Sequence, residues 1–193
     1  QGNLNNDIGV PLTLLRLKSG DRHAVIEMGM NHPGEIDYLT KLASPTIALI
    51  NNAAAAHLAG LGSVEAVARA KGEIYAGLAA DGIAVVNADD SYADLWRTLA
   101  VPHRVITFGL DRPADISAQY QLDACGSTIH LKTPYGGIRM RLSLLGRHNV
   151  MNALAAAAAA HGAGASLDAI VDGLARMRAV AGRLEIKALP GGA

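Results

Sequence analysis

The sequence has little charge and a single cysteine, and both shortages narrow the class of protein. Only 18% of its 193 residues are Asp, Glu, Lys or Arg, against about 25% in an average soluble domain. The 17 basic and 17 acidic side chains cancel, so no overall positive field favours nucleic acid or an anionic membrane as a partner. The lone Cys125 excludes an intramolecular disulfide and is typical of a reducing compartment, so we expect a cytoplasmic protein.

Long apolar runs are also absent. The longest apolar tract, residues 153–160, is far shorter than the roughly 20 residues of a membrane-spanning helix. The opening residues, QGNLNNDIGV, lack the basic and apolar blocks of a signal peptide. We therefore expect no membrane insertion, and the 193 residues suit one well-buried α/β domain better than two.

Segments of strand and helix character alternate along the first half of the chain. Buried strands are predicted at residues 23–27, 46–51, 83–87 and 104–108. Helices are predicted at residues 12–17, 35–43, 64–78 and 92–100. Such alternation with short connections predicts an α/β fold with a mostly parallel, doubly wound sheet flanked by helices.

The pattern changes in the second half. Residues 115–144 alternate apolar and polar side chains between turns, which predicts a small antiparallel sheet of about three strands. Helical periodicity then returns at about residues 148–161 and again at about 166–177. Ser166 is a good N-cap for the second of these helices.

Lys71 occupies a place on a helix where an apolar residue is expected. Ser63 is a plausible N-cap, and apolar residues follow it at helical spacing: Val64, Val67, Ala68, Ile74, Tyr75 and Leu78. Lys71 falls at i+7 from Val64, inside this stripe. A lysine in such a place must snorkel to the rim of the core, pair with an acid or be chemically altered.

Polar side chains stand at the ends of three predicted strands. Glu27 ends the first strand, Asn51 ends the second with His57 in the loop beyond it, and Asn87 ends the third. Ligands of open parallel sheets bind at the carboxyl ends of the strands, so Glu27, His57 and Lys71 are predicted to face one crevice. This grouping suits a metal-bound phosphate, whereas a paired acid and a hydrogen-bonded loop histidine are the ordinary alternatives.

The metal interpretation requires a changed lysine, because a free ammonium at Lys71 would repel Mg²⁺. A desolvated lysine with a depressed pKa can add CO₂. The resulting carbamate is an anionic oxygen ligand of the kind that a hard cation prefers. Carbamylated Lys71 is therefore one hypothesis, beside that of a lysine that snorkels.

A second group of polar residues starts the alanine-rich helix. Asn149 and Asn152 are three positions apart, so their amides share one face and can contact the edge of a base such as adenine. An asparagine near a helix start is also a common cap. Arg183 can contact a phosphate or can be an exposed linker residue. Asp89 and Asp90 are interpreted first as helix caps and second as ligands of a ribose.

Seven segments, taken in order, resemble the Mur ligases, the ATP-dependent amide-forming enzymes of peptidoglycan precursor synthesis. They are NLNNDIGVPLTLL, AVIEMGMNHPGEI, ALINNAAAAHLAGLGS, ARAKGEIY, NADD, GRHNVMNALAA and GRLE. The resemblance implies the central, ATP-binding domain of such a ligase, with a fold like that of P-loop NTPases. The first two segments favour the branch that adds D-alanyl-D-alanine to UDP-N-acetylmuramoyl-tripeptide over a ligase of the folylpolyglutamate synthase type.

The resemblance also implies roles for individual residues around ATP and two Mg²⁺ ions. Glu27 would bind the Mg²⁺ that bridges the β- and γ-phosphates, while His57 and a carbamylated Lys71 would serve the second ion. Asn149 and Asn152 would contact adenine.

Three further residues take implied roles at the nucleotide and the peptide. Arg183 would contact the nucleotide, and Asn5 and Asn6 lie where these enzymes approach the muramoyl peptide. The substrate carboxylate would attack the γ-phosphate to give an acyl phosphate, which the amine of the dipeptide then attacks. Two metals suit the negative charge that collects on both groups.

One element of the family is not in this sequence, namely the Gly-rich phosphate loop ending in Gly-Lys-Thr. In the family it lies upstream of the segment that resembles residues 1–15. We therefore assign residues 1–181 to a central domain without that loop, and residues 182–193 to a hinge toward a C-terminal domain. The chain alone is expected to be an inactive part of a monomeric ligase, and the alternative is a non-catalytic nucleotide-binding or scaffold module.

Overall fold

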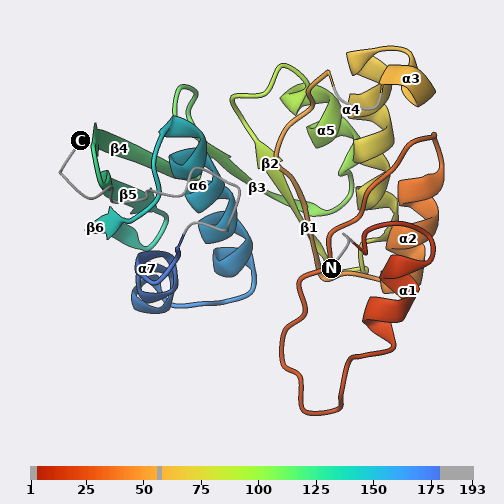
Figure 1. Ribbon diagram of the computed structural model, residues 1–193, viewed down its shortest axis with the longest axis horizontal. Helices are drawn as coiled ribbons and strands as arrows, with labels where there is room; N and C mark the ends of the chain where they lie inside the picture. The colour runs from red at the N-terminus through yellow and green to blue at the C-terminus, as the bar shows by residue number, and fades with distance from the viewer. Residues whose placement is uncertain (1–3, 56–57, 179–193) are drawn as a thin grey trace, which may run out of the picture. The chain divides into compact units, whose positions relative to one another are not determined.

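The computed structural model describes residues 4–55 and 58–178, and its strands form one sheet in the order β1-β2-β3-β4-β5-β6 (Figure 1). The chain divides into two compact units, Gln1–Ile106 and Thr107–Ala193. Strand β3, Arg104–Gly109, crosses this division. The predicted domain boundary at residue 182 lies outside the described residues.

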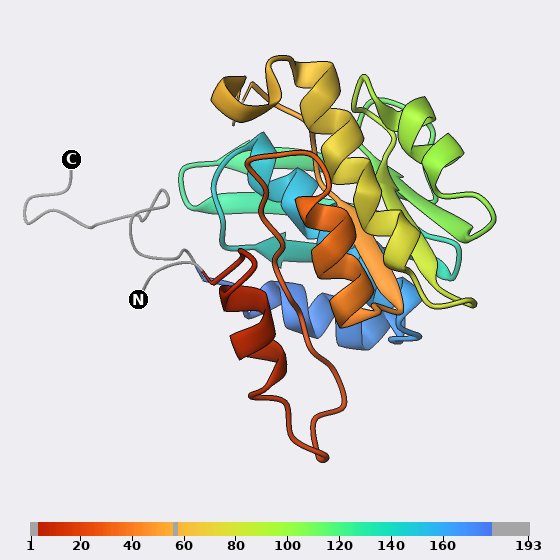
Figure 2. The same cartoon turned by 90° about the vertical axis from the view of Figure 1, so that its right-hand side faces the viewer.

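The first unit packs helices against two short parallel strands. The strands are β1 (Ile47–Ile50) and β2 (Ile83–Asn87), paired in register from Ile47 with Ile83 to Ile50 with Val86. The helices are α1 (Gly9–Leu14), α2 (Glu35–Ala43), α3 (Leu58–Leu61), α4 (Val64–Gly72), the 3₁₀ helix η1 (Glu73–Gly77) and α5 (Ala93–Leu99). Helices α2 and α4 contact each other and lie side by side in Figure 2.

The core of this unit lies around α4. One cluster joins the helix to the strands through Ala68, Tyr75 and Trp96, and a second joins it to α2 through Val67 and Ile36. The two polar atoms that enter the first cluster are satisfied by backbone carbonyls, as buried donors must be. The Tyr75 hydroxyl donates to the Val85 carbonyl at 3.0 Å, and the Trp96 indole nitrogen donates to the Ala68 carbonyl at 2.9 Å.

Most of the predicted elements of the first unit are confirmed. Helix α2 and strand β2 have the predicted bounds, and the Ser63 hydroxyl accepts from the Ala66 backbone N–H as an N-cap does. Helix α1 begins at Gly9, earlier than predicted, because the Asn6 side chain accepts from the Gly9 N–H at 2.8 Å and caps the first turn.

The predicted strand at residues 23–27 is wrong. Residues 21–30 form neither helix nor strand, and the Val25 side chain is 100% exposed. Both ribbon views show the segment between α1 and α2 as a long loop that extends away from the strands (Figures 1 and 2). A short apolar run is typical of a buried strand, but a strand also needs a neighbour, and none of the described strands pairs with this segment.

The second unit contains the antiparallel strands predicted for residues 115–144. They are β4 (Ile116–Asp123), β5 (Gly126–Thr133) and β6 (Gly136–Leu142), each antiparallel to the next. The parallel pairing of Phe108 with Ile116 makes them continuous with β3. Two helices cover them, α6 (Arg147–Gly162) and α7 (Leu167–Ala175), and Ser166 caps α7 as predicted.

Every helix in residues 4–55 and 58–178 is too short or too polar to cross a bilayer.

Leu154 of α6 is fully buried at 0% exposure, whereas Leu122 of β4 remains 45% exposed. Substitution of each leucine therefore compares how much a core side chain and a surface side chain of the same unit contribute to the free energy of unfolding.

We predict that Leu154→Ala lowers the free energy of unfolding by about 2–5 kcal/mol, because it removes buried methyl groups and leaves a cavity. Leu122→Ala is the matched control, and its effect should stay below about 1 kcal/mol. Urea denaturation followed by circular dichroism measures both. Equal losses for the two variants would contradict the assignment of Leu154 to the core.

Candidate functional site

Lys71 lies in the last turn of α4, on the side that packs toward the strands. Its side chain is half-buried, and its Nζ donates to the backbone carbonyl of Asn52 at 2.6 Å, just beyond the end of β1. Burial lowers the pKa of Lys71, and the nearby Asp90 carboxylate opposes that shift only in part. Lys71 thus lies at the rim of the core, and its amine is easier to deprotonate than that of an exposed lysine.

The loops that follow β1 and β2 are tied together beside Lys71. The Asn87 side chain donates to the Asn51 carbonyl at 2.8 Å. The Asp90 carboxylate accepts from the Ala53 N–H and from the Tyr92 N–H, both at 2.9 Å. These bonds hold the carboxyl ends of the two strands in one place. The Asp90 carboxylate closes the turn before α5, whose N-cap residue is Tyr92 and not the predicted Asp90.

Glu27 lies in the long loop, where its side chain is exposed. One of its carboxylate oxygens accepts from the Asn5 side chain at 3.0 Å, and the Asn5 carbonyl accepts from the Gly29 N–H at 2.7 Å. A Cβ at Gly29 would lie 2.7 Å from the amide nitrogen of Asn5, so a larger residue there would displace the Asn5 side chain. The structure thus joins Glu27 and Asn5, which were predicted for the metal and the peptide respectively.

The predicted metal group remains a prediction. No cluster of three or more His, Cys, Asp or Glu side chains within the described ranges is arranged to hold a metal. His57 lies outside those ranges, and the hydrogen bonds of Glu27 and Lys71 lead to different neighbours, Asn5 and Asn52. Glu27 offers an exposed carboxylate, the oxygen donor that Mg²⁺ prefers, whereas Lys71 would supply an oxygen ligand only as a carbamate.

Asn149 and Asn152 share one face of α6, as predicted. The Asn149 side chain donates to the Leu145 carbonyl at 2.8 Å, and the Asn152 side chain lies 3.4 Å from the Asn149 amide oxygen. Asn149 therefore closes the start of the helix, while Asn152 is exposed. Contact of either residue with adenine remains a prediction, and Arg183 lies outside the described residues.

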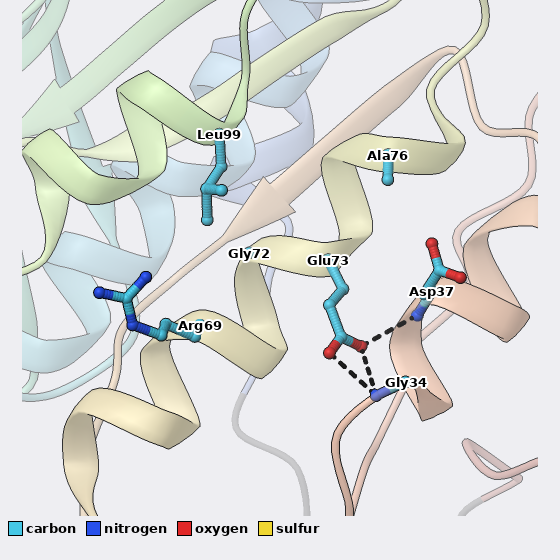
Figure 3. A pocket seen from close by; sticks show the side chains of 7 residues that line it. All are labelled: Gly34, Asp37, Arg69, Gly72, Glu73, Ala76 and Leu99. Atoms are coloured by element: carbon cyan, nitrogen blue, oxygen red, sulfur yellow. Dashed lines mark hydrogen bonds between the residues drawn. The ribbon is translucent and has the colours of Figure 1, made fainter.

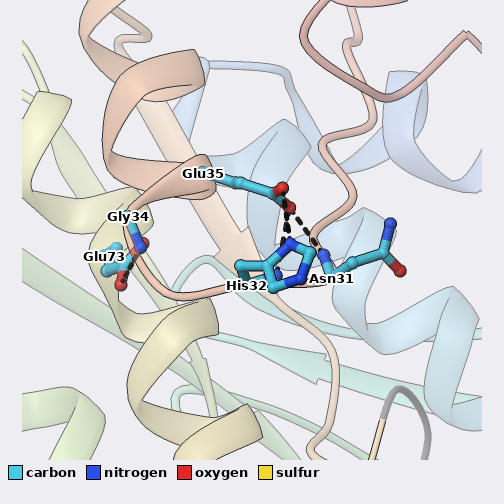
Figure 4. A network of polar contacts seen from close by, with 5 residues as sticks. All are labelled: Asn31, His32, Gly34, Glu35 and Glu73. Carbon is cyan, nitrogen blue, oxygen red and sulfur yellow. Dashed lines mark hydrogen bonds and ion pairs between the residues drawn. The ribbon is translucent and has the colours of Figure 1, made fainter. Parts of the chain in front are cut away.

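Glu35 closes the loop that leads into α2, a role that periodicity alone did not indicate (Figure 4). Its carboxylate accepts from the Asn31 N–H at 2.6 Å and from the His32 N–H at 3.2 Å, and also pairs with the His32 ring at 3.1 Å. The backbone N–H of Asn31, with smaller help from His32, holds the pKa of Glu35 below its usual value. The feature of the sequence that could have indicated this role is a glutamate four residues after Asn31, just before the helix.

Glu73 ties the helix of Lys71 to the start of α2 (Figure 3). Its two carboxylate oxygens accept from the Gly34 N–H at 2.9 and 3.0 Å, and one also accepts from the Asp37 N–H at 3.2 Å. A carboxylate at a helix N-terminus satisfies unpaired N–H groups and complements the positive end of the helix dipole. The cavity of about 390 Å³ around Glu73 contains none of the predicted site residues.

A family model described as the Mur ligase middle domain matches residues 1–160. The chain belongs to the Mur ligase family. It is 49% identical over 185 residues to the UDP-N-acetylmuramoyl-tripeptide--D-alanyl-D-alanine ligase of Escherichia coli, covering 95% of this chain and 41% of that protein. The ligase of the same name from Haemophilus influenzae is 50% identical, and the match covers 95% of this chain and 40% of that protein. The chain thus spans about two fifths of these relatives.

Solved structures of the family agree. The crystal structure of MurF from Acinetobacter baumannii has a TM-score of 0.94 at 41% identity, over 98% of this chain and 42% of that one. A second structure from the same organism is named UDP-N-acetylmuramoylalanyl-D-glutamyl-2,6-diaminopimelate--D-alanyl-D-alanyl ligase. It has a TM-score of 0.91 at 40% identity, over 98% of this chain and 42% of that one. MurF ligase from Thermotoga maritima, in complex with ADP, has a TM-score of 0.85 at 26% identity, over 97% of this chain and 43% of that one.

We predict that Glu73→Ala lowers the free energy of unfolding by about 1–2 kcal/mol, because it leaves the Gly34 and Asp37 N–H groups without their acceptor. Glu65→Ala, one helix earlier, removes only an exposed pair with Arg69 and should cost less than about 0.5 kcal/mol. Chemical denaturation of both variants tests this difference. An effect of Glu73→Ala as small as that of Glu65→Ala would show that the tie contributes nothing to stability.

Proposed function

We propose that this chain is the central, ATP-binding part of a ligase that adds D-alanyl-D-alanine to UDP-N-acetylmuramoyl-tripeptide in peptidoglycan precursor synthesis. The observation that carries the proposal is the 49% identity to the E. coli ligase across 95% of the chain. The half-buried Lys71 beside the ends of β1 and β2 supports it, since ligands of parallel sheets bind there. A cytoplasmic, monomeric enzyme is part of the same proposal.

In the proposed reaction, the carboxylate of the tripeptide attacks the γ-phosphate of ATP and forms an acyl phosphate and ADP. The amine of D-alanyl-D-alanine then attacks the acyl carbon, and phosphate leaves. Mg²⁺ would neutralise the charge that gathers on the phosphoryl and acyl oxygens. Glu27, His57 and Lys71 would hold the ions, and the bond from Asn5 holds the Glu27 carboxylate in one orientation.

The remaining proposed contacts concern the nucleotide and the peptide. Asn149 and Asn152 would face adenine from α6, and Arg183 would meet the nucleotide. Asn5 would lie beside the peptide. Asn6 contributes indirectly, because its side-chain oxygen is already used to cap α1.

Lys71 would act as a carbamate. Its neutral amine adds CO₂ and releases one proton, and the anion formed is a ligand for Mg²⁺. Two observations support the step. Burial makes the neutral amine more available by lowering the pKa, and the 2.6 Å bond to the Asn52 carbonyl needs only one N–H, which a carbamate retains.

We predict a carbamate signal when the full-length protein is placed in ¹³C-bicarbonate and examined by ¹³C NMR. Because only the neutral amine reacts, the signal should grow as the pH rises from about 6 to 9. Lys71→Ala should remove it, whereas Lys41→Ala, which changes an exposed lysine paired with Asp37, should not. A spectrum of the wild type without this signal at high bicarbonate would exclude the carbamate.

We predict that the full-length protein releases phosphate from ATP only when both the muramoyl tripeptide and D-alanyl-D-alanine are present. Lys71→Ala should lower kcat by about 100-fold or more, since a charge-stabilising ligand is lost, while Lys41→Ala keeps wild-type turnover. Unchanged turnover of Lys71→Ala would remove this residue from the mechanism. Activity with a folate and glutamate instead would favour the folylpolyglutamate alternative, and no turnover with either pair would favour a scaffold.

A further inference from the structure

One peptide bond lies between the side chains of Lys71 and Asp90. The amine of Lys71 donates to the Asn52 carbonyl at 2.6 Å. The Ala53 N–H donates to the Asp90 carboxylate at 2.9 Å. The carbonyl of residue 52 and the N–H of residue 53 belong to the same peptide bond, which is planar. The lysine and the aspartate therefore hold the two ends of one rigid group.

The carboxylate can act on the amine through this peptide bond. A peptide bond is a dipole whose positive end is the N–H, so an anion at the Ala53 N–H makes the Asn52 carbonyl a stronger acceptor. Linked hydrogen bonds strengthen one another in this way by about 10–30% each. Ala53 packs against the core cluster that contains Tyr75 and Trp96, where the effect exceeds that in water because the dielectric constant is lower.

The orientation of Asp90 is fixed by its own turn. One oxygen of its carboxylate accepts from the Tyr92 N–H at 2.9 Å, and the other accepts from Ala53. The preceding peptide bond is held as well, because the Asn87 side chain donates to the Asn51 carbonyl at 2.8 Å. Side chains from the end of β2 and the turn after it thus fix the segment that follows β1, and the carbonyl that accepts from the lysine cannot turn away.

Direction matters at this lysine because a carbamate is planar. When the neutral Lys71 amine adds CO₂, its lone pair forms the new N–C bond, one electron pair of a C=O bond moves onto oxygen, and one proton is released to solvent. The nitrogen keeps a single N–H, which lies in the plane of the two new oxygens by the resonance that flattens a peptide bond. The bond from this N–H to the Asn52 carbonyl therefore decides where the oxygens point.

We propose that Asp90 is a positioning residue for Lys71. It acts through the peptide bond of Asn52 and Ala53 and sets the direction of the amine and of the oxygens that the carbamate offers to Mg²⁺. In this role Asp90 contacts neither the substrate nor the ion. The inference rests on the proposed function and adds to it the residue that aligns its lysine.

The first test follows the full-length, ¹⁵N-labelled wild type by NMR as ¹³C-bicarbonate is added without nucleotide. As the carbamate signal grows, the Ala53 amide proton resonance should shift with the same midpoint, because the hydrogen bond at the other end of its peptide bond changes. In Lys71→Ala, bicarbonate should leave this resonance in place. An Ala53 resonance that does not move while the carbamate forms in the wild type would overturn the inference.

The second test is Asp90→Asn, which keeps the shape of the side chain and removes its charge. An amide offers one oxygen where a carboxylate offers two, so one of the bonds to Ala53 and Tyr92 is lost. The carbamate should still form, since loss of this charge lowers the pKa of Lys71 further. Its N–H should exchange with water about tenfold faster. We expect kcat to fall about tenfold with KM for ATP within about twofold, because the ligand is present but misaligned.

Asp94→Asn is the matched control. It removes the same charge from the first turn of α5, where the side chain is 89% exposed and pairs with Arg97. The N–H exchange of the carbamate and kcat should both keep their wild-type values. A thermal melt reports on the folding of each variant. A lower melting temperature of Asp90→Asn, with wild-type N–H exchange and kcat, would show a structural role alone and refute positioning.

The outcomes separate this inference from the proposed function. Turnover of the muramoyl tripeptide and D-alanyl-D-alanine by the wild type, together with a fixed Ala53 resonance, would support the ligase and refute the role of Asp90. No turnover would refute the proposed function, and no carbamate signal would refute the step at Lys71. Either of these two results would remove the inference as well.

Discussion

The carboxylate of Glu73 joins the two parts of the first unit on which the proposed chemistry depends. It follows Lys71 by two residues, and it accepts from the backbone N–H groups of Gly34 and Asp37 at the start of α2. The loop before α2 leads back to Glu27. A shift of the end of α4 relative to the start of α2 would therefore have to break these hydrogen bonds.

Electrostatics sets the state of Lys71. Burial favours its neutral amine, and the Asp90 carboxylate favours its ammonium, with burial the larger effect. Asp90 is itself held by the N–H groups of Ala53 and Tyr92, so its position beside Lys71 is fixed by the loops that follow β1 and β2. The net effect lowers the pKa of Lys71 and so raises the fraction of neutral amine, the form that reacts with CO₂.

The loop before α2 is held in place by a carboxylate of its own. Glu35 is used within the loop, where it satisfies the N–H groups of Asn31 and His32.

Short-range patterns in the sequence predicted helix positions and most strands. The serine caps at Ser63 and Ser166 and the apolar stripe of α4 depend on neighbours within one or two helical turns, so the sequence is enough to find them. The place of Lys71 in that stripe was predicted for the same reason. The segments that resemble Mur ligases also predicted the family of the chain, and the family model confirms that prediction.

What required the tertiary structure were the contacts between residues far apart in the chain. The strand expected at residues 23–27 is a loop, because pairing depends on a neighbouring strand and not on the apolar character of the segment itself. The bonds from Glu73 to Gly34, and from Asn5 to Glu27, span 39 and 22 residues. Local periodicity is determined by the sequence itself, whereas these distant pairs form only when the packing of helices and loops brings their atoms within hydrogen-bonding distance.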